Sequence, residues 1–411
     1  MKVQRCATPA EPRVLIHTPE PCSGAAVYVA AIARAVAGAG AHVSVLCPEN
    51  FAWRDDLAQS GVRMVCTGRR GTEEASLIRR LCRNLRFAAG LLVRQLRAAP
   101  SCDLIHFQFP LYFPVGTAYF LAAKWQGRTV VYTAHDPVPH KWLLPGFLRW
   151  IEKSSLGLAY RLSDGVVVHS PEAAALLAKT FRVNPSRISV IPHGSSALDP
   201  SEVTFPGPGP VTLLLFGSIR EDKGIHLAIE AVQRVNASGI QVRLVIAGAV
   251  ANARERAYWD RCKQMLAENA PGITVIEGFV AEGDVPKLLA GAHAVLLPYA
   301  SATSDSGVAF LALGNGRPIL ATNKGSFAQL FESADVGVPI ESASAGSVEK
   351  VIRDAVSLGA GGLQAKGLAG LAFVRDTRSW PRVGRQTFYL YSRLLAGRAF
   401  VAAAVREPNL D

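Results

Sequence analysis

The sequence lacks the features that mark a membrane-spanning, exported or zinc-binding protein. No apolar run approaches the ~18 to 20 residues that a transmembrane helix needs, so we expect no membrane span. The first 20 residues hold no apolar signal core and lead into a strand at Val14–Ile16, which predicts that the chain is not exported. The 7 cysteines show no CxxC spacing. They are therefore interpreted as reduced, buried thiols of a cytoplasmic protein, and no metal site is expected.

Negative charge is scarce in the N-terminal half of the chain. Residues 1–200 hold 23 of the 44 Lys+Arg and 13 of the 32 Asp+Glu, a net charge of +10, whereas the remainder carries 21 minus 19, or +2. A basic surface of this kind suits nucleic acid, an anionic substrate or an anionic membrane. No nucleic-acid partner is expected, because no recognition motif and no interleaved aromatic residues accompany the charge.

Strand-like and helix-like runs alternate along the chain, which is typical of parallel α/β layers. A segment rich in Pro and Gly, residues 198–210, interrupts the alternation and is the best candidate for a linker. We predict a Rossmann-like domain over residues 1–197 and a second one over 211–380, with a cleft between them. An apolar helix at about 381–411 would pack back across the two halves.

Ligands of open α/β sheets bind beyond the carboxyl ends of strands, so the loops after strands are the positions to inspect. In the N-terminal half, the small residues Ser23, Gly24 and Ala25 precede a helix, which fits a phosphate or tight packing of helix on strand. His135 and Asp136 end a strand and are followed by prolines. This pair could bond a polar substrate or move a proton, and the alternative is a histidine satisfied in the core.

Two loops of the C-terminal half carry residues suited to a diphosphate. The segment FGSIREDKG places Gly217, Arg220 and Lys223 after an apolar strand and before a helix. A solvated charged loop is the alternative interpretation of this segment. Further on, a turn and helix start with hydroxyl and backbone donors follow another buried strand; its residues are Asp305, Ser306, Gly307 and Val308. Cations after one strand and a helix start after another describe a nucleoside diphosphate site.

These segments resemble the motifs of GT-B glycosyltransferases, in particular those of glycosyltransferase family 4. The resemblance covers nearly the whole chain, in the expected order, through SGAAVYVAAIARAV, TAHDPVPH, VIPHG, FGSIREDKG and LLPYASATSDSGVAFLALGNGRPILAT. It implies two Rossmann-like domains and a nucleoside diphosphate sugar as donor, with no cofactor. It also implies that Arg220 and Lys223 hold the diphosphate without a metal, that His135 faces the transferred sugar, and that Gly24 and Ala25 admit the leaving phosphate.

The donor loop departs from the pattern of many family members. Their E-x7-E glutamates align with Thr303 and Leu311, and the SDSGV sequence resembles a divergent subgroup with a Ser-Gly-Val turn. The resemblance implies a retaining hexosyltransferase that acts on a lipid-linked saccharide or polysaccharide precursor. The missing glutamates keep a second hypothesis open, a non-catalytic subunit that binds nucleotide sugar or assists assembly.

A basic amphipathic helix is predicted from Ser76 to Arg97. One side carries leucine and isoleucine and the other carries arginine: Leu77, Ile78, Leu81, Leu85, Leu92 and Leu96 against Arg79, Arg83, Arg86, Arg94 and Arg97. Every Rossmann helix needs an apolar stripe, so simple packing on the sheet is the alternative. With the preceding Arg69 and Arg70, the pattern favours docking of Arg69–Arg97 on the anionic, cytoplasmic face of the cell membrane.

Overall fold

The computed structural model describes residues 11–71, 77–139, 142–250, 252–267, 270–300 and 306–406. They form two compact units, Met1–Gly194 with Trp380–Asp411, and Ser195–Ser379. Within these described ranges no helix is both long and apolar enough to cross a membrane. Asp305 and Thr303 lie outside the described residues.

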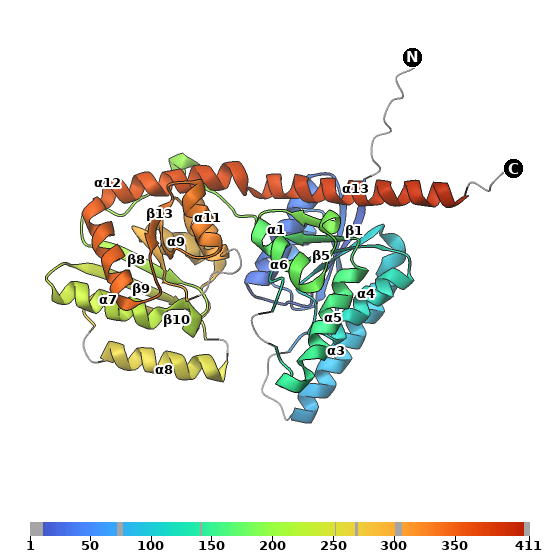
Figure 1. Ribbon diagram of the computed structural model, residues 1–411, viewed down its shortest axis with the longest axis horizontal. Helices are drawn as coiled ribbons and strands as arrows, with labels where there is room; N and C mark the ends of the chain where they lie inside the picture. Colours follow the sequence, from blue (N-terminus) through green and yellow to red (C-terminus); the bar gives the residue numbers. More distant parts are fainter. Residues whose placement is uncertain are drawn as a thin grey trace, which may run out of the picture. The chain divides into compact units, whose positions relative to one another are not determined.

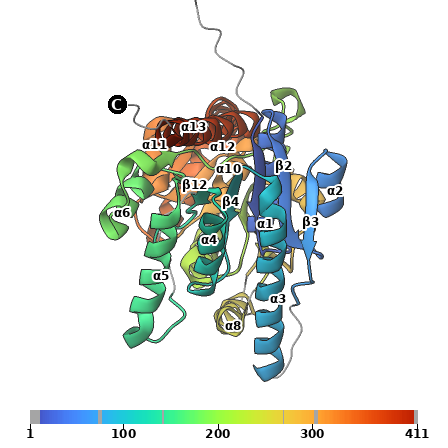
Figure 2. The ribbon, with the colours of Figure 1, turned by 90° about the vertical axis from the view of Figure 1, so that its right-hand side faces the viewer.

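The first unit is a seven-stranded parallel sheet in the order β3-β2-β1-β4-β5-β6-β7 (Figures 1 and 2). Its strands are β1 (Arg13–His17), β2 (His42–Pro48), β3 (Arg63–Thr67), β4 (Leu104–Gln108), β5 (Thr129–Thr133), β6 (Gly165–Val168) and β7 (Ile188–Val190). Its helices are α1 (Gly24–Gly38), α2 (Arg54–Gln59), α3 (Leu77–Ala98), α4 (Val115–Trp125), α5 (Arg149–Leu162), α6 (Pro171–Phe181) and α13 (Trp380–Arg406).

Alternation of apolar side chains along the strands covers both faces of this sheet. Val14 and Ile16 of β1 join a core with α1 and α13, whereas Leu15 between them joins the opposite core under α3, α4, α5 and α6. Successive side chains of a strand point to opposite faces, so continuous apolar strands such as these require a layer of helices on each side. The C-terminal helix α13 supplies part of one layer by packing against α1.

The second unit is a six-stranded parallel sheet in the order β10-β9-β8-β11-β12-β13. Its strands are β8 (Val211–Phe216), β9 (Val242–Gly248), β10 (Ile273–Glu277), β11 (Ala294–Leu297), β12 (Ile319–Thr322) and β13 (Gly337–Ile340). Its helices are α7 (Ile225–Ala237), α8 (Ala253–Ala267), α9 (Val285–Ala290), α10 (Gly307–Gly314), α11 (Ser326–Ser333) and α12 (Ala345–Thr377).

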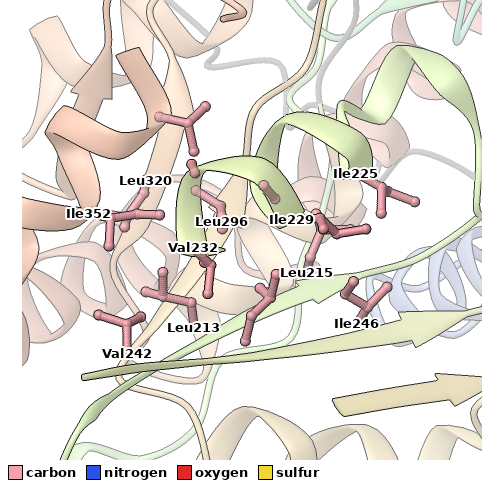
Figure 3. Close-up of a cluster of buried hydrophobic side chains, with 14 of the residues drawn as sticks. Leu213, Leu215, Ile225, Ile229, Val232, Val242, Ile246, Leu296, Leu320 and Ile352 are labelled. Carbon is pink, nitrogen blue, oxygen red and sulfur yellow. The ribbon is translucent and has the colours of Figure 1, made fainter. Parts of the chain in front are cut away.

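One apolar core of the second unit lies between the sheet and helices α7 and α12. Figure 3 shows Leu213 and Leu215 of β8 pointing towards Ile229 and Val232 of α7, with Ile352 of α12 beside them. A second core under α9, α10 and α11 covers the other face of the sheet. Both units therefore have the doubly wound Rossmann arrangement predicted from the alternation of strands and helices.

Several local predictions are wrong. Gly24 and Ala25 do not precede the helix but form its first turn: Gly24 begins α1, and the Ser23 hydroxyl caps that helix by accepting the Ala26 N–H at 3.4 Å. The sequence predicts that the buried strand before the second of the two loops ends at Pro298 and Tyr299, but this strand, β11, ends at Leu297, because Pro298 has no N–H for the ladder. Two cysteines predicted to be buried, Cys22 and Cys82, are exposed.

The segment 198–210 belongs structurally to the second unit. Leu198 donates its N–H to the Gly314 carbonyl at 2.8 Å. The buried Arg317 guanidinium donates to the Thr204 carbonyl and lies over the Phe205 ring, 4.4 Å from its centroid. The compact unit begins at Ser195, because these contacts fix the segment in place.

Candidate functional site

Both sheets reverse their strand order at one point, between β1 and β4 in the first unit and between β8 and β11 in the second. At such a switch point the two following loops diverge and leave room for a ligand at the carboxyl edge. In the second unit these are the loop that contains Gly217–Lys223 and the loop that begins at Pro298 after β11. The structure thus brings the two predicted parts of the diphosphate site to one edge of one sheet.

Two glycines allow these loops to approach each other and the neighbouring strand. Gly224 has φ +67°, and a Cβ there would lie 2.2 Å from the Pro298 carbonyl oxygen. A Cβ on Gly248 would lie 1.8 Å from the Gly217 carbonyl oxygen. No side chain can occupy either position without moving backbone, so the geometry of the site depends on glycine there.

The two cations of the site are held by groups of their own unit. The Lys223 Nζ lies 3.5 Å from the centroid of the Tyr299 ring. The Arg220 Nη2 donates to the Asp222 Oδ2 at 2.7 Å, with both side chains about half-exposed. The Arg220 Nε and the Tyr299 hydroxyl are buried without a hydrogen-bond partner among the described residues. The site therefore holds donors whose bonding capacity is not used within the protein.

The start of α10 lies beside this loop. Ser306 caps the helix by accepting the Ala309 N–H at 3.4 Å, while Gly307 is exposed and Val308 is half-buried. The Val308 Cγ2 lies 3.5 Å from the position that a Cβ on Gly217 would take. The first amide groups of α10 and the positive end of its helix dipole are thus next to Gly217, which favours an anion at this edge.

The second position of the missing E-x7-E pair lies within α10. Leu311 is half-buried and packs against the apolar core under α9, α10 and α11. An ionised glutamate in this environment would need a partner to offset its desolvation. Leucine therefore contributes packing at this position, where many relatives have a carboxylate.

In the first unit, the loop after β1 leaves space above the start of α1. Gly24 is exposed, and a Cβ there would meet no atom within 4 Å. Ser23 and Ala25 beside it are half-buried. This helix start can admit a ligand, and Gly24 is not required by packing within the protein.

The His135 ring is fixed by contacts on its edges and on its face. Its Nε2 lies 3.0 Å from the Gln108 Oε1 and its Nδ1 lies 3.1 Å from the His169 Nε2. The ring stacks on Phe109 with centroids 3.8 Å apart and an interplanar angle of 11°. Both nitrogens are bonded within the unit, which restricts any role of His135 in moving a proton. The adjacent Asp136 side chain is exposed.

Tyr28 of α1 lies at the centre of a cluster of histidines that sequence reasoning did not assemble. Its ring centroid lies 4.6 Å from that of His135, 5.7 Å from that of His169 and 4.9 Å from that of His193. The three histidines follow the neighbouring strands β5, β6 and β7. A histidine within three residues after each strand end was the available sequence signal.

Loss of water holds the pKa of His135 well below its ordinary value. Repulsion from His169, His193 and His106 adds to this effect, because a second positive charge in the cluster would be unfavourable. His135 is thus neutral at physiological pH. Among the described residues, no group of three or more His, Cys, Asp or Glu is arranged to hold a metal ion.

Two Rossmann-like units, each built on a parallel sheet, are the elements of the GT-B architecture. A family model described as Glycosyltransferase Family 4 matches residues 22–196, and one described as Glycosyl transferases group 1 matches residues 210–357. The chain belongs to the GT-B glycosyltransferases of the family 4 type.

Solved structures agree with this fold. The Anabaena HepE protein in complex with UDP and glucose superposes with a TM-score of 0.72 at 17% identity, covering 93% of this chain and 100% of that one. Sucrose-phosphate synthase from Thermosynechococcus elongatus gives a TM-score of 0.72 at 16% identity, covering 94% of this chain and 100% of that one.

A curated relative is a GDP-mannose:glycolipid 4-beta-D-mannosyltransferase of Xanthomonas campestris. It is 27% identical over 251 residues, which are 57% of this chain and 65% of the relative. The matched stretch thus spans less than two thirds of that protein.

Proposed function

We propose that the protein transfers a hexose from a nucleoside diphosphate sugar to a lipid-linked saccharide or a polysaccharide precursor. The observation that carries the proposal is the position of Arg220 and Lys223 at the switch point of the second sheet, in the loop whose Gly217 lies against Val308 at the start of α10. Negative charge develops on the leaving phosphate as the bond between the anomeric carbon and the phosphate oxygen breaks, and fixed cations and helix amides stabilise it. Arg220 and Lys223 would supply this charge without a metal.

The decisive test replaces each cation by alanine. Turnover of the donor by Lys223→Ala and by Arg220→Ala should fall roughly 100-fold or more, because each removes a charge from the transition state. Arg261→Ala is the matched control, since Arg261 pairs with Glu221 of the same loop at 3.4 Å but is largely exposed. Unchanged turnover in both site variants, with the fold intact by circular dichroism, would exclude the proposal.

A binding experiment can identify the nucleobase of the nucleotide sugar that the protein uses as donor. The Xanthomonas relative is named for GDP-mannose, and the Anabaena structure contains UDP and glucose. A thermal-shift screen of UDP-, GDP- and ADP-sugars should raise the melting temperature with one class, because a ligand that binds only the folded state stabilises it. The Lys223→Ala variant should lose that shift.

We propose metal-independent transfer with retention of configuration, and NMR of the product anomer tests it. The name of the Xanthomonas relative specifies a β-linkage, so the product anomer is the informative measurement. Inversion would require a base for the acceptor hydroxyl. Asp136 would then be the candidate, because it is exposed while both nitrogens of His135 are bonded.

A non-catalytic nucleotide-sugar-binding subunit is the second candidate function. It is favoured by the packing role of Leu311, where many relatives have a glutamate. Purified protein that releases nucleoside diphosphate only when an acceptor is added would exclude it. Binding of the donor without such release, over a range of acceptors, would support it.

We propose further that the first unit docks on an anionic membrane. The side chains of Arg79, Arg86, Arg94 and Arg97 on α3 are exposed. Leu85, which the sequence places on the apolar side of that helix, is 56% exposed next to Arg86. An apolar side chain between exposed arginines suits the interface of an anionic bilayer.

A second segment contributes apolar anchors that the sequence analysis did not identify. Leu143 and Phe147 in the segment before α5, and Trp150 in its first turn, are 71%, 77% and 64% exposed. The buried Glu152 carboxylate fixes this segment by accepting the Leu143 and Leu144 N–H groups at 2.9 and 3.0 Å. The beginnings of α3 and α5 extend towards the same end of the first unit (Figures 1 and 2).

Vesicle sedimentation tests the membrane proposal. The double variant Phe147→Ser/Trp150→Ser should lose most binding to vesicles that contain phosphatidylglycerol, because aromatic side chains anchor at the interface. Trp125→Ser is the matched control, since Trp125 is 83% exposed but lies at the C-terminal end of α4. Equal binding by the anchor variant and the control would contradict the assignment of this surface.

A further inference from the structure

A continuous chain of hydrogen bonds crosses the first unit from helix α13 to the end of strand β7. It joins six side chains and ends on a backbone carbonyl, in the order Tyr391, His106, Thr133, Gln108, His135, His169 and the Ile191 carbonyl. Among its side chains, His106, Gln108 and Thr133 are buried in the central strands β4 and β5. Buried polar networks are costly unless every member is satisfied, so the positions of the protons matter.

Both ends of the histidine pair meet acceptors. The Ile191 carbonyl oxygen lies 2.9 Å from the His169 Nδ1, so this nitrogen must donate. At the other end, the Gln108 Oε1 lies 3.0 Å from the His135 Nε2, which must then donate as well. The remaining nitrogens, His135 Nδ1 and His169 Nε2, face each other at 3.1 Å and also need a proton between them.

This orientation of Gln108 therefore requires three protons on two imidazole rings, and hence one positive charge on the pair. The pKa of His135 lies well below its ordinary value, so the charge is unfavourable at neutral pH. Besides Gln108, the groups that face the ring are Tyr28, Phe109 and three histidines, namely His169, His193 and His106, with the Asp136 carboxylate next in the chain.

A half-turn of the Gln108 amide removes the need for the extra proton. The amide nitrogen then donates to the His135 Nε2, and the His135 Nδ1–H donates to the His169 Nε2. On the other side, the amide oxygen occupies the position 3.0 Å from the Thr133 Oγ1, where it can accept the threonine hydroxyl. Every donor then meets an acceptor, and both rings are neutral.

We propose that Gln108 and His169 are positioning residues for His135, and that the orientation of the Gln108 amide decides which ring nitrogen of His135 carries the proton. In the neutral state the amide nitrogen faces His135, and His135 is the Nδ1–H tautomer. Uptake of one proton by the pair turns the amide round. The role of His135 in transfer is then to present a fixed, neutral ring and not to accept a proton.

The same half-turn reaches the C-terminal helix. In the neutral state the His106 Nε2 donates to the Thr133 Oγ1, 2.7 Å away, and its Nδ1 accepts the Tyr391 hydroxyl at 2.5 Å. When the histidine pair takes up a proton and the amide turns back, the Gln108 nitrogen donates towards the His106 Nε2 at 3.0 Å. His106 must then move its proton to Nδ1. The tautomers of His106 and His135 are thereby coupled through one glutamine.

Nitrogen-15 NMR of the histidine rings tests the proposal without any substrate. The His135 signal, assigned with His135→Gln, should show the neutral Nδ1–H tautomer at pH 7.5. Gln108→Glu replaces the donor by an acceptor of the same size, so His135 should become doubly protonated at this pH. Gln108→Leu removes both donor and acceptor, and the two neutral tautomers should then interconvert.

Kinetics supply a second readout besides NMR, and this one rests on the proposed glycosyl transfer. In Gln108→Glu, kcat should fall roughly 10- to 100-fold with the donor KM within about threefold, because a misplaced group costs rate more than binding. Its pH–rate profile should gain an ionisation that the parent lacks. If the parent protein turns over no donor, the NMR result still decides the tautomer. An Nε2–H or doubly protonated His135 in the parent at pH 7.5, or unchanged spectra in both Gln108 variants, would overturn the proposal.

Discussion

At the residue scale, glycine sets how closely the two loops of the donor site approach each other. Gly224 begins the turn into α7 and lies against the Pro298 carbonyl after β11. It combines a positive φ with a backbone contact that leaves no room for Cβ. These two constraints differ in origin, so they can be separated experimentally.

Gly224→Ala is expected to lower the stability of the second unit by about 2–4 kcal/mol, because backbone strain and a steric overlap add. Gly239→Ala is the matched control: its φ is +87°, but a Cβ there meets nothing within 4 Å. It should cost only about 1–2 kcal/mol of left-handed strain. The melting temperatures of the two variants measure these losses of stability. Equal losses would show that the contact with Pro298 is unimportant.

Arg317 is a buried charge that attaches the segment before β8 to the second sheet. Its Nε donates to the Leu289 carbonyl at 2.7 Å, and its Nη2 donates to the Thr204 carbonyl. Burial lowers the pKa of Arg317 to about 10, which still leaves the guanidinium charged at neutral pH. The planar guanidinium has several N–H donors that point in different directions, so it can donate to both carbonyls at once.

Arg317→Lys should destabilise the second unit by about 2–4 kcal/mol, because a single ammonium cannot serve both carbonyls and leaves a buried charge poorly paired. Arg375→Ala is the control on the same segment, since its 3.6 Å pair with Asp199 is exposed and should contribute under about 1 kcal/mol. Limited proteolysis within 198–210 reports the difference. Protection of Arg317→Lys equal to the parent would contradict this role.

At the element scale, α13 completes the helical layer over α1. The two helices meet at Gly384, where a Cβ would lie 2.3 Å from the Ala35 carbonyl oxygen. Small residues at a crossing let helix backbones approach closely and bury the side chains around them. The last helix of the chain is therefore an integral part of the first unit.

Gly384→Leu should separate α13 from α1 and cost the first unit at least about 2–3 kcal/mol through overpacking. Gly397→Ala on the same helix is the control, because a Cβ there meets nothing within 4 Å. It should raise stability by roughly 0.5–1 kcal/mol through helix propensity. Hydrogen exchange of α13 amides measures both effects, and normal protection in Gly384→Leu would contradict the close contact.

At the scale of the whole molecule, buried histidines make the first unit sensitive to acid. Burial lowers the pKa of His17 and of His106 from 6.5 to about 3. Below pH 6.5 the unfolded chain binds protons that the folded chain excludes, so stability falls as the pH falls towards 3. Each histidine contributes roughly 1.4 kcal/mol per pH unit in that range.

His17→Phe should reduce this acid sensitivity. Neither His17 nitrogen has a hydrogen-bond partner among the described residues, and the ring packs between Phe107 and Tyr119. Phenylalanine keeps the apolar contacts and removes one titration. Calorimetry from pH 8 to pH 4.5 should show a shallower decline for the variant, and an identical decline would mean that His17 does not titrate on unfolding.

Much of the architecture follows from the sequence, because strand and helix periods and turn residues are local signals. The order of the strands up to β12, the helices between them other than α2, and the positions of Arg220 and Lys223 after β8 were predicted in this way. The region 326–377, with α11, β13 and α12, was not predicted. Its helices carry glycines and small residues, as at Gly359, where α12 kinks with φ +66°, and these weaken a local helix signal.

The sequence by itself determined the two Rossmann-like units, the family and the loops that carry the donor-site cations, since each depends on residues that are neighbours in the chain. Only the tertiary structure places His169 and Gln108 next to His135. Only the tertiary structure shows that the side chains of Leu85 and Phe147 are exposed to solvent. Parallel strands separated by helices place residues far apart in sequence at one edge of a sheet. The order in which those strands pair is a cooperative property of the whole core, and no single segment encodes it.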